Sequence, residues 1–218
     1  SVSFTDVPSD PLPNPPRYSL WRWSEAGGVE PLATVVTYPS SAIGWQHPEL
    51  FADAAGNLAW REGFPASSVD CGERGVSIQG RESLYELPRE GEPALVAASG
   101  ATAPGRPDLT IARLITRRVS SPGSGFGRRA FAFLFPPPAF DPGGELTFAA
   151  RVADDPCFVD SNDLPEAVFA PDSQGATTLV VREGDPVPGP GAATVHRLLD
   201  FARLVEPEPA LLVLASAD

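Results

Sequence analysis

Apolar and polar residues alternate with a period of two along several short segments, and each of these segments ends in a turn. At residues 19–24 the two tryptophans Trp21 and Trp23 alternate with leucine, arginine and serine, which is the side-chain period of a β-strand. A glycine-containing turn at 26–28 and an apolar return at 29–36 follow. This order predicts a β-hairpin.

The same order of strand, turn and strand recurs twice along the chain. Residues 83–99 read SLYELPREGEPALVAAS, and residues 167–183 read AVFAPDSQGATTLVVRE. Within them, LVAASGATAPG at 95–105 and LVVREGDPVPG at 179–189 match without a gap at a spacing of 84 residues. An internal repeat of this kind indicates an array of similar β-modules.

A further strand is expected to close each module. Residues 53–60 read DAAGNLAW and residues 141–148 read DPGGELTF. Both have an acidic residue, a glycine turn, a leucine, a small residue and an aromatic residue. The third module lacks this closing strand, so a terminal strand is a candidate to supply it.

We therefore predict an all-β fold of repeated antiparallel β-hairpin modules, arranged as propeller-like blades or as a β-sandwich. Two and a half repeats are fewer than the four blades of an ordinary propeller. A sandwich, an open array and a ring completed by other subunits remain as alternatives. The expected parts are a Pro-rich extended arm at 1–17, a repeat domain at 18–206 with modules at 18–82, 83–166 and 167–206, and a C-terminal strand or sorting-signal remnant at 207–218.

Two further segments are predicted to be strands. Residues 192–206 have an apolar face at helical spacing, but their repeat partner at 108–119 is rich in β-branched residues and is typical of a strand. Equal repeats should have equal structures, so we predict a strand at 192–206. The alternating phenylalanines of RRAFAFLF at 128–135 predict another strand.

Composition narrows the classes of function. The chain has 26 prolines and 20 glycines in 218 residues, which leaves little room for long helices. Its formal net charge is −12, and all sixteen positive residues are arginine. The acidic balance argues against nucleic-acid partners and against docking on an anionic membrane. No segment has the ~18–20 apolar residues that a membrane span needs.

The chain begins at Ser1 and contains no methionine, which suggests export with removal of a signal peptide. A fragment of a longer chain would look the same. It has two cysteines, Cys71 and Cys157. In an exported chain a disulfide is the favoured interpretation, and two unrelated buried thiols are the alternative. Two cysteines and two histidines make a structural zinc site a poor fit.

The repeats and closing strands together resemble the choice-of-anchor tandem-repeat proteins of bacteria, whose repeats carry an Asn-x-x-Gly-x-x-Ala-Phe motif. The resemblance rests on LVVREGDPVPG, LVAASGATAPG, GNLAW and GELTFAA. In this chain Asp53 and Asp141 stand where the motif has asparagine, and Ala59-Trp60 and Thr147-Phe148 stand where it has Ala-Phe. The resemblance implies an exported repeat protein that is tied to the envelope by a C-terminal sorting signal and has no agreed enzymatic activity.

The C-terminal sequence EPEPALLVLASAD is similar to the start of a PEP-CTERM sorting signal, with Pro207-Glu208-Pro209 followed by an apolar run. The full apolar span and the basic cluster of such a signal do not follow within the 218 residues. On the alternative interpretation, ALLVLA is a last β-strand.

A nucleophilic hydrolase would need a histidine, and His47 and His196 are the only two. Residues 123–125 read GSG and do not form the G-x-S-x-G turn of an α/β-hydrolase. We therefore expect no catalytic residues and no enzymatic activity.

Two binding sites are weaker candidates. Residues 154–166 gather oxygen ligands that suit Ca²⁺, although their spacing is not that of an EF-hand; these are Asp154, Asp155, Asp160, Asn162, Asp163 and Glu166. An ordinary acidic loop is the favoured interpretation, and no other cofactor is expected. Tryptophans can stack on sugar rings or fill cores; all four lie in the first module, at Trp21, Trp23, Trp45 and Trp60.

The sequence thus favours an extracellular, non-enzymatic structural protein of the cell surface or matrix. Its expected partners are other copies of itself or envelope and matrix components. Unpaired sheet edges invite strand addition, so the hypothesis includes a self-assembling filament subunit linked by strand exchange of a terminal segment. A secreted carbohydrate-binding or adhesin module is the alternative, and a secreted hydrolase is a third candidate.

Overall fold

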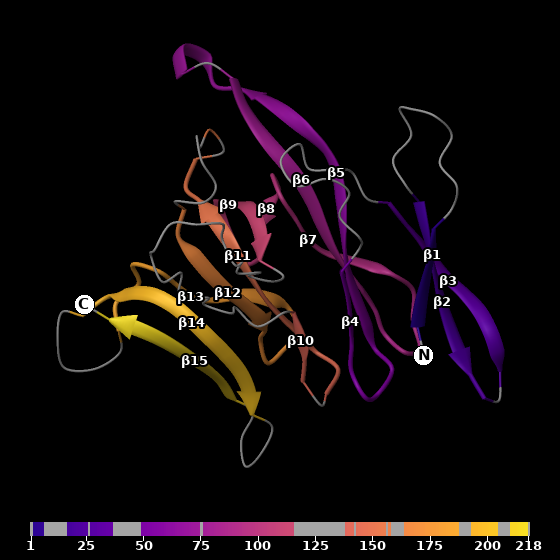
Figure 1. Cartoon of the computed structure of the whole chain (residues 1–218). Coiled ribbons are helices and arrows are strands. Elements are labelled where there is room, and N and C mark those ends of the chain that lie inside the picture. Colours follow the sequence, from indigo (N-terminus) through magenta and orange to yellow (C-terminus); the bar gives the residue numbers. More distant parts are fainter. Residues whose placement is uncertain are drawn as a thin grey trace, which may run out of the picture.

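The computed structural model describes residues 2–6, 17–25, 27–36, 49–74, 76–115, 138–141, 143–155, 157, 164–187, 193–204 and 210–217. In these residues the chain forms β-strands and one short 3-10 turn, η1 (Gly72–Arg74). All pairings between these strands are antiparallel. The prediction of an all-β fold is confirmed (Figure 1).

The strands form three sheets and a hairpin in chain order. Sheet I has the order β1-β2-β3 and consists of β1 (Val2–Asp6), β2 (Arg17–Ser24) and β3 (Gly28–Val36). Sheet II has the order β4-β5-β6-β7 and consists of β4 (Glu49–Ala52), β5 (Leu58–Asp70), β6 (Val76–Leu87) and β7 (Ala94–Ala98).

Sheet III has the order β13-β12-β11-β9-β8, with β10 pairing beside β9 on the same strand β11. Its strands are β8 (Thr102–Ala103), β9 (Arg106–Ile115), β10 (Ala139–Phe140), β11 (Leu146–Ala153), β12 (Glu166–Pro171) and β13 (Thr177–Arg182). The C-terminal hairpin pairs β14 (Val195–Leu204) with β15 (Ala210–Ala217).

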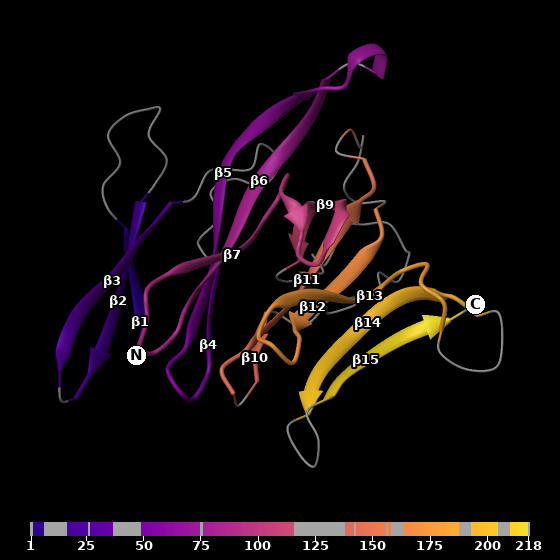
Figure 2. The same ribbon diagram turned by 180° about the vertical axis from the view of Figure 1, so that it is seen from behind.

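The sheets stack face to face as an open row, with the two ends of the chain at opposite ends of the row (Figures 1 and 2). Three apolar clusters fill the spaces between them. Leu20 of sheet I packs with Leu58 and Trp60 of sheet II. A larger cluster joins sheets II and III, and a third joins sheet III to Val195 and Leu198 of β14.

Sheets II and III repeat the same antiparallel meander, β4-β5-β6-β7 in one and β10-β11-β12-β13 in the other. Trp60 lies opposite Tyr85 in sheet II, and Phe148 lies opposite Phe169 in sheet III. Each aromatic pair is stacked, with ring centroids 5.5 Å and 5.2 Å apart. A register shift interrupts the pairing beside the aromatic residue in β6–β7, in β12–β13 and, at Trp21, in β2–β3.

The backbone hydrogen bonds of the two repeats match at the spacing of 84 residues seen in the sequence. The matched donor and acceptor pairs are Ser99 N to Glu82 O (2.8 Å) with Glu183 N to Glu166 O (2.9 Å), and Gly100 N to Ile111 O (2.7 Å) with Gly184 N to Val195 O (2.7 Å). The two copies therefore share their backbone geometry as well as their sequence.

An aspartate and a glycine define three of the hairpin turns. In each turn the aspartate Oδ1 accepts a hydrogen bond from the backbone N–H four residues later; the pairs are Asp53 with Asn57 (2.8 Å), Asp141 with Glu145 (2.8 Å) and Asp172 with Ala176 (3.1 Å). The residue before each of these donors is a glycine with positive φ, 96°, 84° and 78° in turn order. Glycine is favoured there because a Cβ is strained in the left-handed region.

The predicted strand at 192–206 is confirmed as β14. From Val195 to Leu198 its pairing with β15 reproduces the pairing of β9 with β11. Beyond Leu198 a second register shift skips Leu199, and this shift has no counterpart in β9. In β9 one residue, Ala112, is skipped between the partners of Val152 and Arg151. In β14 the residue 84 positions later, His196, is skipped in the same way. Strand β15 therefore occupies the place that β11 has in sheet III.

Several sequence-based expectations fall on residues 7–16, 37–48, 116–137, 158–163 and 205–209, which lie outside the described residues. These include the strand expected at 128–135 and most of the Pro-rich arm. In the described part of that arm, Val2–Asp6 form β1 and pair with β2.

Candidate functional site

The first module's tryptophans have different surroundings. Trp60 is buried, with 2% of its surface exposed, and it stacks on Tyr85. Its indole nitrogen donates a hydrogen bond of 3.0 Å to Glu62 Oε1. Burial leaves this ring no face for a sugar, so Trp60 serves packing. Trp21 is half-buried on β2, whereas Trp45 and the side chain of Trp23 lie outside the described residues.

Glu62 is a carboxylate in an apolar setting. Only 8% of its surface is exposed, and burial raises its pKa while the hydrogen bond from Trp60 opposes that rise. Burial also raises the pKa of Tyr85, and the nearby Glu62 charge adds to this effect. The ionised form of Glu62 is therefore disfavoured in the folded state.

Replacing Glu62 by glutamine is expected to raise the melting temperature at neutral pH. A raised folded-state pKa stabilises the fold at acidic pH, and this contribution is lost as pH rises through that pKa. Glutamine removes the buried charge while its carbonyl oxygen can still accept from Trp60. Thermal unfolding should therefore show a gain of a few degrees at neutral pH that disappears below about pH 4, where Glu62 is itself protonated.

The matched control is Glu90→Gln, because Glu90 is exposed. This variant should change the melting temperature little at either pH. A melting temperature for Glu62→Gln below that of the parent protein at neutral pH would contradict the interpretation.

Two half-buried carboxylates tie strands together. Glu82 Oε2 accepts a hydrogen bond of 3.1 Å from the backbone of Leu114 in β9, and its Oε1 pairs with Arg61 at 2.9 Å. In the next repeat the backbone of Leu198 in β14 donates to Glu183 Oε1 at 3.2 Å. Both copies thus use a carboxylate to hold the third strand of the module.

The calcium candidates do not gather around one point among the described residues. Asp154 pairs with Arg182 at 3.0 Å, and Asp155 Oδ1 accepts a hydrogen bond of 2.8 Å from the backbone of Cys157. Glu166, 3% exposed, pairs with Arg151 at 2.9 Å. The remaining three, Asp160, Asn162 and Asp163, lie outside the described residues. In the described part of the chain no group of three or more His, Cys, Asp or Glu side chains is placed to hold a metal ion.

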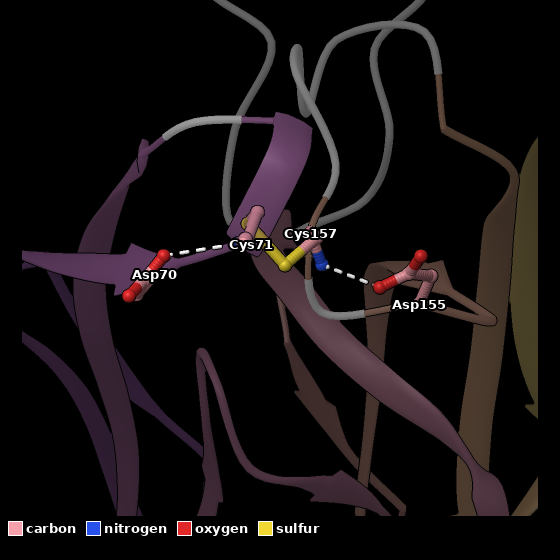
Figure 3. The surroundings of a disulfide bond; sticks show 5 residues. Asp70, Cys71, Asp155 and Cys157 are labelled. Atoms are coloured by element: carbon pink, nitrogen blue, oxygen red, sulfur yellow. Dashed lines mark hydrogen bonds between the residues drawn. A yellow bond between two sulfur atoms is a disulfide. The ribbon is translucent and has the colours of Figure 1, made fainter.

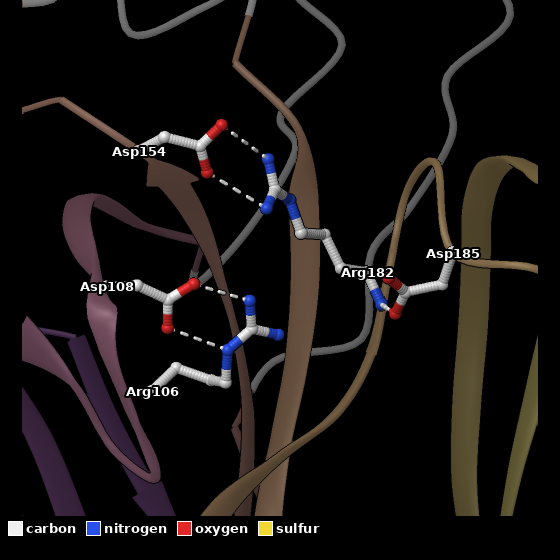
Figure 4. A network of polar contacts seen from close by, with 5 residues as sticks. All are labelled: Arg106, Asp108, Asp154, Arg182 and Asp185. Carbon is white, nitrogen blue, oxygen red and sulfur yellow. Dashed lines mark hydrogen bonds and ion pairs between the residues drawn. The ribbon is translucent and has the colours of Figure 1, made fainter.

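Two arginine–aspartate pairs lie close together where β9, β11 and β13 meet (Figure 4). Arg106 donates to both oxygens of Asp108 at 2.9 Å and 2.7 Å. The hydrogen bond from Arg106 holds the pKa of Asp108 at about 2. Arg182 pairs with Asp154, and its backbone N–H donates to Asp185 at 2.7 Å. Each guanidinium is matched to a carboxylate, which is typical of a structural network.

The histidines do not form a catalytic group in the described residues. His196 is exposed at the bulge of β14, while His47 and Ser124 lie outside the described residues.

Cys71 and Cys157 form a disulfide, as the sequence favoured, with Cα atoms 5.7 Å apart (Figure 3). Cys71 follows β5 at the tip of the long β5–β6 hairpin, and Cys157 follows β11. The bond therefore ties the end of this sheet II hairpin to sheet III. At either side of it, Asp70 accepts from the backbone of Gly72 and Asp155 accepts from that of Cys157, at 2.9 Å and 2.8 Å.

Strand edges at the two ends of the row are candidate surfaces for recognition. In sheet III, β11 pairs with β9 on one edge and with β12 on the other. Its equivalent β15 pairs with β14 alone among the described strands. At the other end, β1 pairs with β2 and carries no second partner among those strands. These two terminal edges are the candidate functional site. The sequence predicts strand exchange by a terminal segment, but it does not show which edges are open, because that depends on the pairing of strands.

No known protein family model, curated protein or solved structure matches this chain. The resemblance to the choice-of-anchor repeat proteins therefore stays an expectation from the sequence. In the part of the chain that the structure describes, no helix has the length and hydropathy to cross a bilayer.

Proposed function

We propose that this chain is an extracellular, non-enzymatic structural protein of the cell surface or matrix, and that it assembles with other copies of itself. The subunits join head to tail, and a terminal strand of one copy adds to a terminal sheet of the next. The disulfide supports an oxidising compartment. The row of similar sheets supports a role in contact with other molecules.

The observation that carries the proposal is the fit between the two ends. Inside the row, sheet III contains the consecutive strands β9-β11-β12-β13. The C-terminal hairpin β14–β15 reproduces the first two of these strands, and β2–β3 reproduce the last two. The two ends are thus the two halves of one interior sheet.

Such a joint is heterologous because it uses different surfaces on the two copies. Repetition of a heterologous joint gives a closed ring if the rotation closes and a filament if it does not. Both forms use the same contacts, and the sequence-based hypothesis of a filament subunit is one of them.

Assembly is expected to depend on protein concentration and on the C-terminal hairpin. The mass of the full chain, measured by light scattering at rising concentration, should increase in steps of one subunit mass. Electron microscopy should show rings or filaments. Deleting residues 205–218 should leave particles of single-subunit mass, because the deletion removes β15, the strand that would add to the next copy.

Circular dichroism of the deletion variant must show retained β-structure. The control variant is Val180→Ser, which changes an exposed residue (46% exposed) on β13, away from both ends. This variant should assemble like the parent protein. A full chain that stays a single subunit at every concentration would refute the proposal.

A further inference from the structure

We propose that β15 is the exchanged strand and that it enters the next copy by replacing β1 on the edge of β2. This inference rests on the proposed function and specifies its joint. The N-terminal strand β1 is then a cap that covers the acceptor edge of each copy until assembly.

The strand registers indicate that β1 and β15 would pair with the same edge of β2. Leu198 in β14 lies opposite Ala215, as Leu114 in β9 lies opposite Ala150. Ala215 is therefore the equivalent of Ala150. Ala150 also lies opposite Ala167 in β12.

The register shift that β12 and β2 share shows which residue of β2 is equivalent to Ala167. The shift falls between Val168 and Phe169 in β12 and between Leu20 and Trp21 in β2. Ser19 is thus the equivalent of Ala167. In the isolated chain, Ser19 lies opposite Thr5 of β1. Thr5 and Ala215 consequently compete for one site.

This equivalence gives the register of the joint residue by residue. Ala215 should lie opposite Ser19 of the next copy, Leu214 opposite Leu20 and Val213 opposite Trp21. The resulting sheet would have the order β14-β15-β2-β3, with β2 and β3 from the next copy. It repeats the order β9-β11-β12-β13 of sheet III.

The residues of β15 suit this place better than those of β1. Opposite Trp21, the cap offers Ser3, whereas β15 would offer Val213. Facing pairs of an aromatic and a β-branched residue stabilise antiparallel sheets. The two interior sheets place the aromatic residues Trp60 and Phe148 at this position.

Length favours β15 as well. Strand β1 has five residues and β15 has eight. Each added residue pair contributes further ladder hydrogen bonds and buries more side-chain surface. Burial of Trp21 gives a further reason for the joint. The equivalent residue Phe169 is fully buried between two sheets, whereas Trp21 is half-buried in the single chain. The joint supplies a neighbouring sheet at that face.

A disulfide between β1 and β2 tests the exchange directly. The variant Thr5→Cys/Ser19→Cys places two cysteines at facing positions, which an antiparallel pair can bridge. When oxidised, this lock should keep β1 in place and reduce the assembled fraction at least tenfold. Reductant should restore assembly. The parent protein in the same reductant controls for loss of the native disulfide.

Mixing two singly substituted proteins tests the register. Ser19→Cys and Ala215→Cys should form a mixed disulfide between copies under oxidising conditions, read as a dimer on a non-reducing gel. Ser19→Cys mixed with Arg203→Cys is the control, since Arg203 lies near the other end of β14 opposite Leu211. It should give little of the mixed product.

The outcomes separate the inference from the proposed function. If the locked protein assembles as well as the parent protein, the joint exists but β15 does not replace β1. A mixed disulfide between Thr5→Cys and Leu198→Cys, in place of the one at Ala215, would show that β1 is the strand that moves. Absence of assembly by the parent protein would overturn both proposals.

Discussion

Replacing Phe169 by alanine is expected to lower the free energy of unfolding by about 3–5 kcal/mol, the usual cost of removing a large core aromatic side chain. Phe169 has 0% of its surface exposed and lies in the cluster between sheets II and III. Its ring stacks on Phe148 at a centroid distance of 5.2 Å. The substitution therefore removes the stacking contact and leaves a cavity in the largest core.

Chemical denaturation followed by circular dichroism measures this effect. Tyr85→Ala, at the equivalent position of sheet II, should cost less, because Tyr85 is only partly buried. Val180→Ala is the surface control and should stay within about 0.5 kcal/mol of the parent protein. If the loss for Phe169→Ala were as small as for Val180→Ala, the stacked pair would not be part of a packed core.

Removal of the disulfide is expected to cost about 4.5 kcal/mol. The bond closes a loop between residues 86 positions apart, and the chain-entropy model gives this value for a loop of that length. The double variant Cys71→Ser/Cys157→Ser is the appropriate protein, because a single substitution leaves an unpaired thiol. Its unfolding midpoint in guanidinium should fall well below that of the parent protein.

Reductant supplies the matched comparison. It should lower the midpoint of the parent protein to that of the double variant and leave the double variant unchanged. Equal midpoints for the oxidised parent protein and the double variant would mean that the bond does not restrict the unfolded chain in the way the model assumes.

Much of this fold can be predicted from residue patterns. The alternation around Trp21 and the internal repeat at a spacing of 84 residues predict hairpins, and the described structure contains them. Asp-x-x-Gly sequences mark the turns at Asp53 and Asp141 because the carboxylate accepts backbone hydrogen bonds and the glycine takes positive φ. Burial raises the pKa of Asp53, but the hydrogen bonds from Asn57, Gly56 and Ala55 outweigh that effect and keep the pKa below its ordinary value.

The pairing between modules could not be predicted in the same way. Sheet II takes β4, β5 and the first part of β6 from the segment assigned to the first module, and the rest of β6 and all of β7 from the second. A hairpin pattern shows that two strands meet but does not specify which strand covers the remaining edge. The strands β8 and β10 have two residues each, too few to show any alternation.

The candidate site was partly visible in the sequence. The apolar run at the C-terminus predicts a strand, and β15 is that strand. Its equivalence to β11 emerges only from the skipped residue His196, since no sequence motif links LLVLASA with LTFAARVA.

The matched hydrogen bonds of the two repeats have a consequence for growth of the molecule. Ser99 and Glu183 donate to equivalent carbonyl groups 84 residues apart, and Gly100 and Gly184 do the same. The chain therefore passes from sheet II to sheet III in the same way as it passes from sheet III to β14. A gene duplication that adds one more unit would repeat this connection, so the length of the molecule can change by whole units.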